Sequence, residues 1–152
     1  MKKQNYRKLG MKSMRVLIDT NVIMDFIVER GSFTSDAEKV IGLCIEKRIP
    51  CCITAHTVPN LFYILRKHLS IEERRDVLLK ICKMFTVVGI DSNKLESALQ
   101  DSNFEDFEDC LQVQCAKDFP ADFIVTRNVK DFANSSVSVL EPVKLIAKLS
   151  EL

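Results

Sequence analysis

Short apolar runs alternate with amphipathic segments along this chain of 152 residues. The first run, residues 16–18 (Val-Leu-Ile), stops at Asp19 and predicts a strand buried on both faces. An amphipathic segment from Val22 to Glu29 follows at once and predicts a helix. Further apolar runs predict strands at 51–54, 85–90, 122–126 and 137–140. Segments of helical spacing lie between them, at 35–45, 57–68, 70–84, from 91 or 92 onward, 106–117 and 142–149.

Two of the predicted helices begin with the spacing of a capping box, in which a serine and a glutamate three residues later exchange hydrogen bonds. The pairs are Ser35 with Glu38 and Ser70 with Glu73. Pro142 opens the last helix, because proline is favoured in a first turn. Alternating strands and helices, without repeat or linker, predict one α/β domain over residues 14–152. Its parallel sheet has four or five strands and is covered by helices on both faces.

Charge is distributed unevenly along the chain. The net charge is +1, yet residues 1–15 carry six bases and no acid, so the remaining 137 residues, with 16 bases and 21 acids, have a net charge of −5. Residues 1–13 form a basic leader that lacks the apolar region of a secretory signal. The leader is either a nucleic-acid-binding arm or an upstream start, with Met14 as the true beginning. No apolar run is long enough for a membrane span, and we expect a cytoplasmic protein.

Six cysteines occur without a C-x-x-C spacing, and most lie in apolar stretches. Buried cysteine behaves as a small hydrophobic residue. We therefore expect six free thiols in a reducing cytoplasm.

Polar residues follow the predicted strands at the edge where ligands bind in an open parallel sheet. Asp19 and Asn21 follow the first strand and His56 the second. The fourth strand is followed by Thr126, Arg127, Asn128 and Asp131. Asp106 and Asp109 share the first turn of the helix before that strand, where acids also favour the positive end of the helix dipole.

Several carboxylates at one edge repel one another unless they share a proton or bind a cation. Oxygen ligands without clustered His or Cys favour Mg²⁺ or Mn²⁺ over zinc. Such ions activate a water molecule for cleavage of a phosphodiester. Nuclease chemistry is therefore the class of reaction that these residues favour.

Four blocks of the sequence resemble PIN-domain ribonucleases, the fold of the VapC-type toxins. They are residues 17–22 (Leu-Ile-Asp-Thr-Asn-Val), 53–63 (Ile-Thr-Ala-His-Thr-Val-Pro-Asn-Leu-Phe-Tyr), 106–111 (Asp-Phe-Glu-Asp-Cys-Leu) and 125–132 (Val-Thr-Arg-Asn-Val-Lys-Asp-Phe). The resemblance extends from Arg15 to about Pro142. It implies a three-layer α/β/α fold and a metal-dependent endoribonuclease that hydrolyses RNA with a metal-activated water. It also implies a small antitoxin protein as partner and a homodimer.

The resemblance also implies roles for particular residues. Asp19 and Asp109 match the first and third acids of the family and would ligate the metal, and Asp131 matches the acid of the fourth block. Asn60 and Asn128 stand where many members have an acid, which favours one metal ion over two. The supporting residues would be Asn21, Asn60, Asp106, Thr126 and Asn128. His56 and Arg127 would contact substrate, although His56 also fits a helix cap and Arg127 an outward salt bridge.

Three other functions compete with this interpretation. A phosphatase of the HAD type would need a second acid where Asn21 stands. A phosphoacceptor receiver domain would use Asp91 and an acid pair after the first strand. The neutral Asn60 and Asn128 also fit a catalytically weak or inactive RNA- or protein-binding module.

The acidic body of the chain bears on the binding of RNA. RNA binding depends on positive charge near the phosphates. If RNA is the substrate, we expect local positive charge from Arg66, Lys67 and Lys130, or from a dimer groove.

Overall fold

Five parallel strands form the centre of the molecule in the computed structural model, which describes residues 14–151. They lie in the order β3-β2-β1-β4-β5, and every neighbouring pair is parallel. Their bounds are β1 Val16–Ile18, β2 Cys51–Thr54, β3 Thr86–Val88, β4 Phe123–Val125 and β5 Ser138–Leu140. The predicted α/β class is therefore confirmed, and the parallel sheet, predicted to have four or five strands, has five. The basic leader, residues 1–13, lies outside the described residues.

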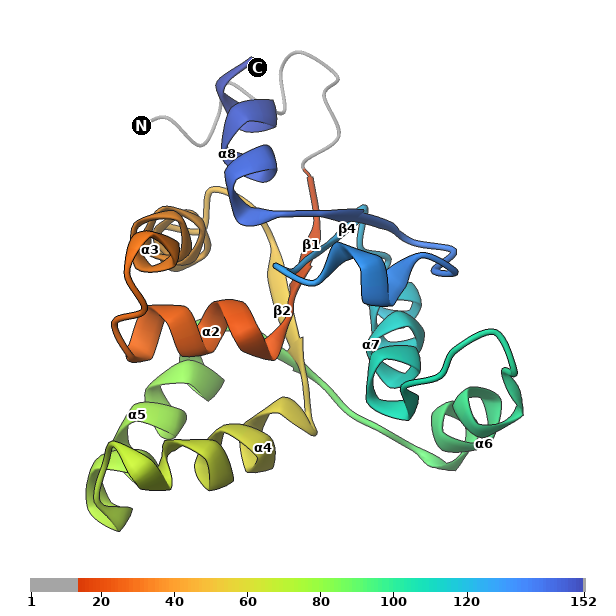
Figure 1. Cartoon of the computed structure of the whole chain (residues 1–152), viewed down its shortest axis with the longest axis horizontal. Helices are drawn as coiled ribbons and strands as arrows, with labels where there is room; N and C mark the ends of the chain where they lie inside the picture. Colours follow the sequence, from red (N-terminus) through yellow and green to blue (C-terminus); the bar gives the residue numbers. More distant parts are fainter. Residues whose placement is uncertain (1–13, 152) are drawn as a thin grey trace.

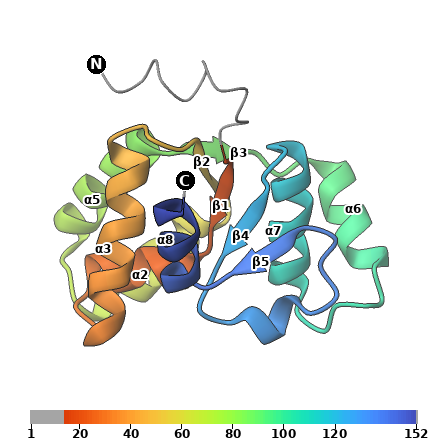
Figure 2. The same cartoon turned by 90° about the horizontal axis from the view of Figure 1, so that it is seen from above.

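Helices cover both faces of this sheet and give three layers (Figures 1 and 2). One face packs against α2, α3, α4, α5 and α8, and the other against α7, with α6 outside it. The helices are α2 Thr20–Ile27, α3 Ser32–Ile45, α4 Thr57–Ile64, α5 Ile71–Met84, α6 Ser92–Gln100, α7 Phe107–Asp118 and α8 Pro142–Ser150. Two short 3-10 helices, η2 Leu65–Lys67 and η3 Val129–Phe132, follow α4 and β4.

The central strand β1 is buried on both sides, as its uninterrupted apolar run predicts. Val16 and Ile18 pack into the core beneath α2, α3 and α8, whereas Leu17 packs into the core beneath α7. Each of these side chains contributes about 1.5–3 kcal/mol by burial. The rigid strand fixes the position of the next residue, Asp19.

The helices begin within two residues of their predicted starts, with α3 as the exception, and the first predicted helix (22–29) lies two residues earlier, at Thr20–Ile27. The capping box at Ser70 is confirmed, because Glu73 N donates to Ser70 Oγ over 3.2 Å and Ser70 N donates to Glu73 Oε2 over 2.8 Å. The capping box at Ser35 is wrong. Gly31 has a φ of 60° and lets the chain turn into α3 earlier, so that the helix begins at Ser32.

The expectation of six free thiols is wrong for one pair. Cys44 of α3 and Cys51 of β2 form a disulfide, because the tight turn between them brings their Cα atoms to 5.7 Å. The other four cysteines, Cys52, Cys82, Cys110 and Cys115, are free thiols. None of the helices described between residues 14 and 151 has the length and hydrophobicity to cross a membrane.

Candidate active site

Asp19 stands at the junction of β1 and α2 and is only 6% exposed. Its Oδ1 accepts hydrogen bonds from Thr20 N at 2.6 Å and from Gln112 Nε2 of α7 at 2.8 Å. Its Oδ2 accepts from Thr126 Oγ1 at 2.7 Å and from Asn21 Nδ2 at 3.1 Å. Both oxygens are therefore held in place by groups from three parts of the chain.

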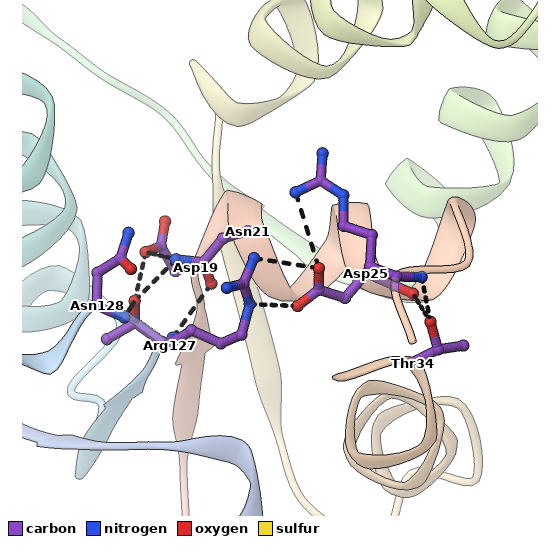
Figure 3. A network of polar contacts seen from close by, with 8 residues as sticks. Asp19, Asn21, Asp25, Thr34, Arg127 and Asn128 are labelled. Carbon is purple, nitrogen blue, oxygen red and sulfur yellow. Dashed lines mark hydrogen bonds and ion pairs between the residues drawn. The ribbon is translucent and has the colours of Figure 1, made fainter. Parts of the chain in front are cut away.

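The loop after β4 is fixed to α2 by a second set of hydrogen bonds (Figure 3). Thr126 Oγ1 accepts from Asn128 N at 3.0 Å and from Asn21 Nδ2 at 3.1 Å, and Asn21 Oδ1 accepts from Arg127 N at 3.3 Å. Asn21, Thr126 and Asn128 thus lie where the sequence predicts supporting residues. Asn21 and Thr126 bond directly to Asp19, whereas Asn128 acts through Thr126.

Four further carboxylates line one cleft of about 740 Å³ beside this junction, namely Glu105 and three of the predicted site residues. Asp106 and Asp109 come from the start of α7 and Asp131 from η3, and Lys130 lies in the same wall. Asp106 caps α7 by accepting from Asp109 N at 3.1 Å. The structure therefore gathers the predicted acids of the third and fourth blocks.

The electrostatics of this cleft centre on Asp109. Partial burial raises the pKa of its carboxyl to about 7, and the negative charges of Asp106, Asp19, Asp131 and Glu108 add to that rise, in this order. Asp19 does not line the cleft, but its charge reaches Asp109. Gln112 lies one helical turn beyond Asp109 and donates a hydrogen bond to Asp19, so α7 carries both Asp109 and a donor to Asp19.

The start of α4 lies opposite the start of α7. Asn60 Nδ2 donates to Glu108 Oε2 over 3.3 Å, so the second and third sequence blocks meet here. The imidazole of His56 precedes α4 and makes no capping hydrogen bond, which excludes the capping alternative. Burial lowers the pKa of His56, although the charges of Glu108, Asp19 and Asp106 oppose that change.

Two buried polar atoms in the described part of the chain lack a hydrogen-bond partner, and both belong to this site. They are His56 Nδ1 and Gln112 Oε1. Buried polar atoms are nearly always paired, so such an exception indicates strain or a missing ligand. Gln112 bonds to Asp19, and the charge of Asp19 acts on His56, so these two atoms are candidate ligand contacts.

The side chains described at this site do not form a closed metal site. Within residues 14–151, no group of three His, Cys, Asp or Glu side chains could hold an ion as they stand. The chemistry fits a hard cation nevertheless, because the available donors are oxygens. The pKa of Asp109 is raised first by burial and then by the charges of neighbouring acids, and a cation would offset those charges. The unpaired Gln112 Oε1 is a further oxygen donor.

Arg127 forms an ion pair, but not the outward salt bridge that the sequence offered as the alternative to a substrate contact. Its Nε donates to Asp25 Oδ2 over 2.5 Å and its Nη2 to Asp25 Oδ1 over 3.2 Å. The pair is directed inward, because Asp25 is 1% exposed, and Arg127 also lies 4.3 Å over the ring of Phe33. Figure 3 shows the guanidinium turned toward Asp25 and away from Asp19.

The rival functions find less support in this geometry. Asp91, the acceptor of a receiver-like site, caps α6 by accepting from Lys94 N at 2.9 Å. Asn21, in the place of a phosphatase's second acid, uses its amide to hold Asp19 and Thr126.

Sequence reasoning missed two residues of this region. Gln112 is 3% exposed and sits between the buried Leu111 and Val113, so a polar residue inside an apolar stretch was the available signal. Asp25 lies on the buried side of α2, where a carboxylate needs a cationic partner.

Comparisons with known proteins identify the family and the fold. A family model described as "PIN domain" matches residues 15–130. Ribonuclease VapC1 of Aquifex aeolicus (strain VF5) is 24% identical over 134 residues, which cover 86% of this chain and 92% of the relative.

Two solved structures share the fold. A toxin-antitoxin complex from Klebsiella pneumoniae superposes with a TM-score of 0.63 at 22% identity, covering 84% of this chain and 97% of the other. VapC20 of Mycobacterium tuberculosis, titled a sarcin-ricin loop cleaving toxin, superposes with a TM-score of 0.62 at 11% identity, covering 80% and 95%. At these identities the likeness establishes the fold.

Proposed function

This chain belongs to the PIN-domain family, and we propose that it is a metal-dependent endoribonuclease that acts as the toxin of a toxin-antitoxin pair. The observation that carries the proposal is the convergence of Asp106, Asp109 and Asp131 on one cleft beside Asp19. Asp19 and Asp106 each cap a helix, but capping does not require Asp109 and Asp131 to face the same cleft. The relative from Aquifex aeolicus is named a ribonuclease, which supports RNA as the substrate.

Asp19 and Asp109 would hold one Mg²⁺ or Mn²⁺, with Asp131 completing the acidic set. When bound, the cation would activate a water molecule and stabilise the leaving oxygen of the phosphodiester. Asn128 and Asn60 carry no charge, so the site has fewer negative groups than one built to hold two cations tightly.

The other residues of the site position these acids. Gln112, Asn21 and Thr126 fix the orientation of the Asp19 carboxylate. Asn60 donates to Glu108, which stands next to Asp109 at the start of α7. The lowered pKa of His56 keeps its imidazole neutral at pH 7, so that it can donate one hydrogen bond to a phosphate oxygen of the substrate.

An antitoxin partner is proposed because the solved neighbours include a toxin-antitoxin complex. A small antitoxin protein would cover the acidic cleft and inhibit the nuclease. A homodimer and a cytoplasmic location are proposed on the same family grounds.

RNA cleavage by the purified protein tests this function. Structured and single-stranded RNA would be incubated with Mg²⁺, Mn²⁺ or EDTA, and the products separated on a denaturing gel. We expect cleavage only with metal, and a loss of at least about a hundredfold in Asp19→Asn and in Asp109→Asn. Asp76→Asn, an exposed acid of α5, is the matched control and should cleave normally.

Three outcomes would contradict the proposal. Cleavage that persists in both acid variants would show that another site or a contaminant is responsible. Metal-dependent release of phosphate from monoesters, without RNA cleavage, would favour a phosphatase. Tight RNA or protein binding by a folded but inert protein would favour a non-catalytic module.

A further inference from the structure

A second hollow, of about 320 Å³, lies where the loop after α2 meets the end of α4. Its lining residues are mostly basic or aromatic: Arg30, Tyr63, Ile64, Arg66, Lys67 and His68. We call it the basic groove. Helices α2 and α4 lie side by side here (Figure 1), so the groove is formed by packed elements of the core.

The charge of the basic groove contrasts with that of the rest of the molecule. No Asp or Glu occurs between Ala55 and Ile71, a stretch that contains Arg66, Lys67 and His68. Residues 101–109, at the acidic cleft, contain five acids. Within the described part of the chain, Arg66 and Lys67 form no ion pair. Their charges are therefore free to attract an anion.

The groove also offers a flat stacking surface. Tyr63 is 63% exposed, and the guanidinium of Arg66 lies 3.7 Å from the centre of its ring. A hydrogen bond from Arg66 Nη1 to the Tyr63 carbonyl, 2.9 Å long, fixes the guanidinium in that position. Aromatic rings and guanidinium planes stack on the bases of single-stranded nucleic acid.

Helix α4 joins the groove to the candidate active site. Asn60 contacts Glu108, the chain neighbour of the cleft residue Asp109, and Tyr63 and Ile64 follow three and four residues later on the same side of the helix. The whole helix has 8 residues and a length of about 12 Å. A strand of RNA at the cleft therefore needs only a few more nucleotides to reach Arg66 and Lys67.

We propose that the basic groove binds single-stranded RNA next to the cleavage point, with Arg66 and Lys67 on phosphates and a base stacked on the Tyr63–Arg66 pair. The inference rests on the proposed function, because it assigns RNA to the neighbouring cleft. It explains how a chain with a net charge of −5 beyond residue 15 holds a polyanion.

Fluorescence anisotropy with a labelled single-stranded RNA, in EDTA, tests the groove without any cleavage. The double variant Arg66→Ala/Lys67→Ala should bind about tenfold more weakly, and its salt slope should fall by about 1.4, because two phosphate contacts are lost. Tyr63→Ala should weaken binding about fivefold or more, whereas Tyr63→Phe should retain binding because the ring remains. The control Lys80→Ala/Lys83→Ala removes the same charge from the exposed surface of α5 and should bind RNA normally.

The outcomes separate this inference from the proposed function. Equal RNA binding by the Arg66→Ala/Lys67→Ala variant and by the natural chain would overturn the assignment of RNA to the basic groove, even if metal-dependent cleavage is intact. Weaker binding in that variant would support the groove, even if no RNA is cleaved. Labelled polyglutamate is compared in the same way. If it binds the natural chain as tightly as RNA does, and if this binding is lost in the Arg66→Ala/Lys67→Ala variant, the groove is assigned to an acidic protein and the RNA assignment is overturned.

Discussion

At Asp19, burial and hydrogen bonding act together on one carboxylate. Four donors surround its two oxygens, and the side chain is almost inaccessible. Gln112 is the donor that comes from α7, the helix that also carries Asp109. It therefore fixes the position of one acid relative to the other, and we regard it as a positioning residue.

Gln112→Leu should lower the rate of RNA cleavage by about 10–100-fold, since it leaves Asp19 Oδ1 without its donor from α7. RNA affinity, measured by anisotropy in EDTA, should not change. Gln114→Leu, the same substitution two residues along α7, is the matched control and should cleave normally. Equal losses in both variants would show that the effect comes from the helix and not from the bond to Asp19.

Asp109→Asn should stabilise the metal-free protein while abolishing cleavage. Because burial and neighbouring acids raise the pKa of Asp109 from 3.8 to about 7, ionisation of this group favours the unfolded chain. The natural protein therefore loses folding stability through Asp109 as the pH rises from about 4 to about 7, and the loss is complete above 7. Discounted for solvent screening, the gain in Asp109→Asn is about 1 kcal/mol, or about 2–4 °C in Tm.

Thermal unfolding in EDTA at about pH 5 and about pH 8 measures this effect. The difference in Tm between Asp109→Asn and the natural chain should be larger at the higher pH. A difference in Tm that is absent or of opposite sign at the higher pH would show that the folded environment does not raise the pKa of Asp109.

At the scale of elements, the site depends on how the β4–η3 loop is attached to α2. The Asp25–Arg127 pair joins them, and Arg30 approaches the same carboxylate at 3.8 Å. Thr34 of α3 completes the attachment by donating to the Asp25 carbonyl over 3.0 Å. Three segments are thereby held in the arrangement that places Thr126 and Asn21 around Asp19.

Asp25→Ala should lower the free energy of unfolding by about 3–5 kcal/mol, because it leaves the Arg127 guanidinium without its buried partner. The corresponding fall in Tm is roughly 6–20 °C. Glu46→Ala removes an acid from an exposed pair with Arg48, 3.9 Å apart, and should cost less than about 1 kcal/mol. Similar losses in the two variants would show that the Asp25 pair is no stronger than a surface one.

At the scale of the whole molecule, the sequence predicts the fold better than the contacts within it. The five strands lie within two residues of their predicted positions, because each is an apolar run buried by its neighbours. The bond between Gln112 and Asp19 spans 93 residues and the Asp25–Arg127 pair spans 102, and such distant pairings leave no local pattern. The Cys44–Cys51 disulfide spans only seven residues, but it depends on the turn that joins α3 to β2, and the spacing of the two cysteines is not that of a C-x-x-C motif.

The distribution of charge is also a property of the whole molecule. The acids gather at the end of the sheet near α7, and the unpaired bases Arg66 and Lys67 lie at the far end of α4. A metal ion and an RNA backbone make opposite electrostatic demands, and separate surfaces on one rigid framework can meet both.

The central claim is that Asp19 and Asp109 share one cation. Isothermal titration of the RNA-free protein with Mn²⁺ tests it most directly. We predict one bound cation per chain, with affinity at least about tenfold weaker in Asp19→Asn and in Asp109→Asn and unchanged in Asp76→Asn. Equal affinity in the natural chain and in Asp109→Asn would contradict the account.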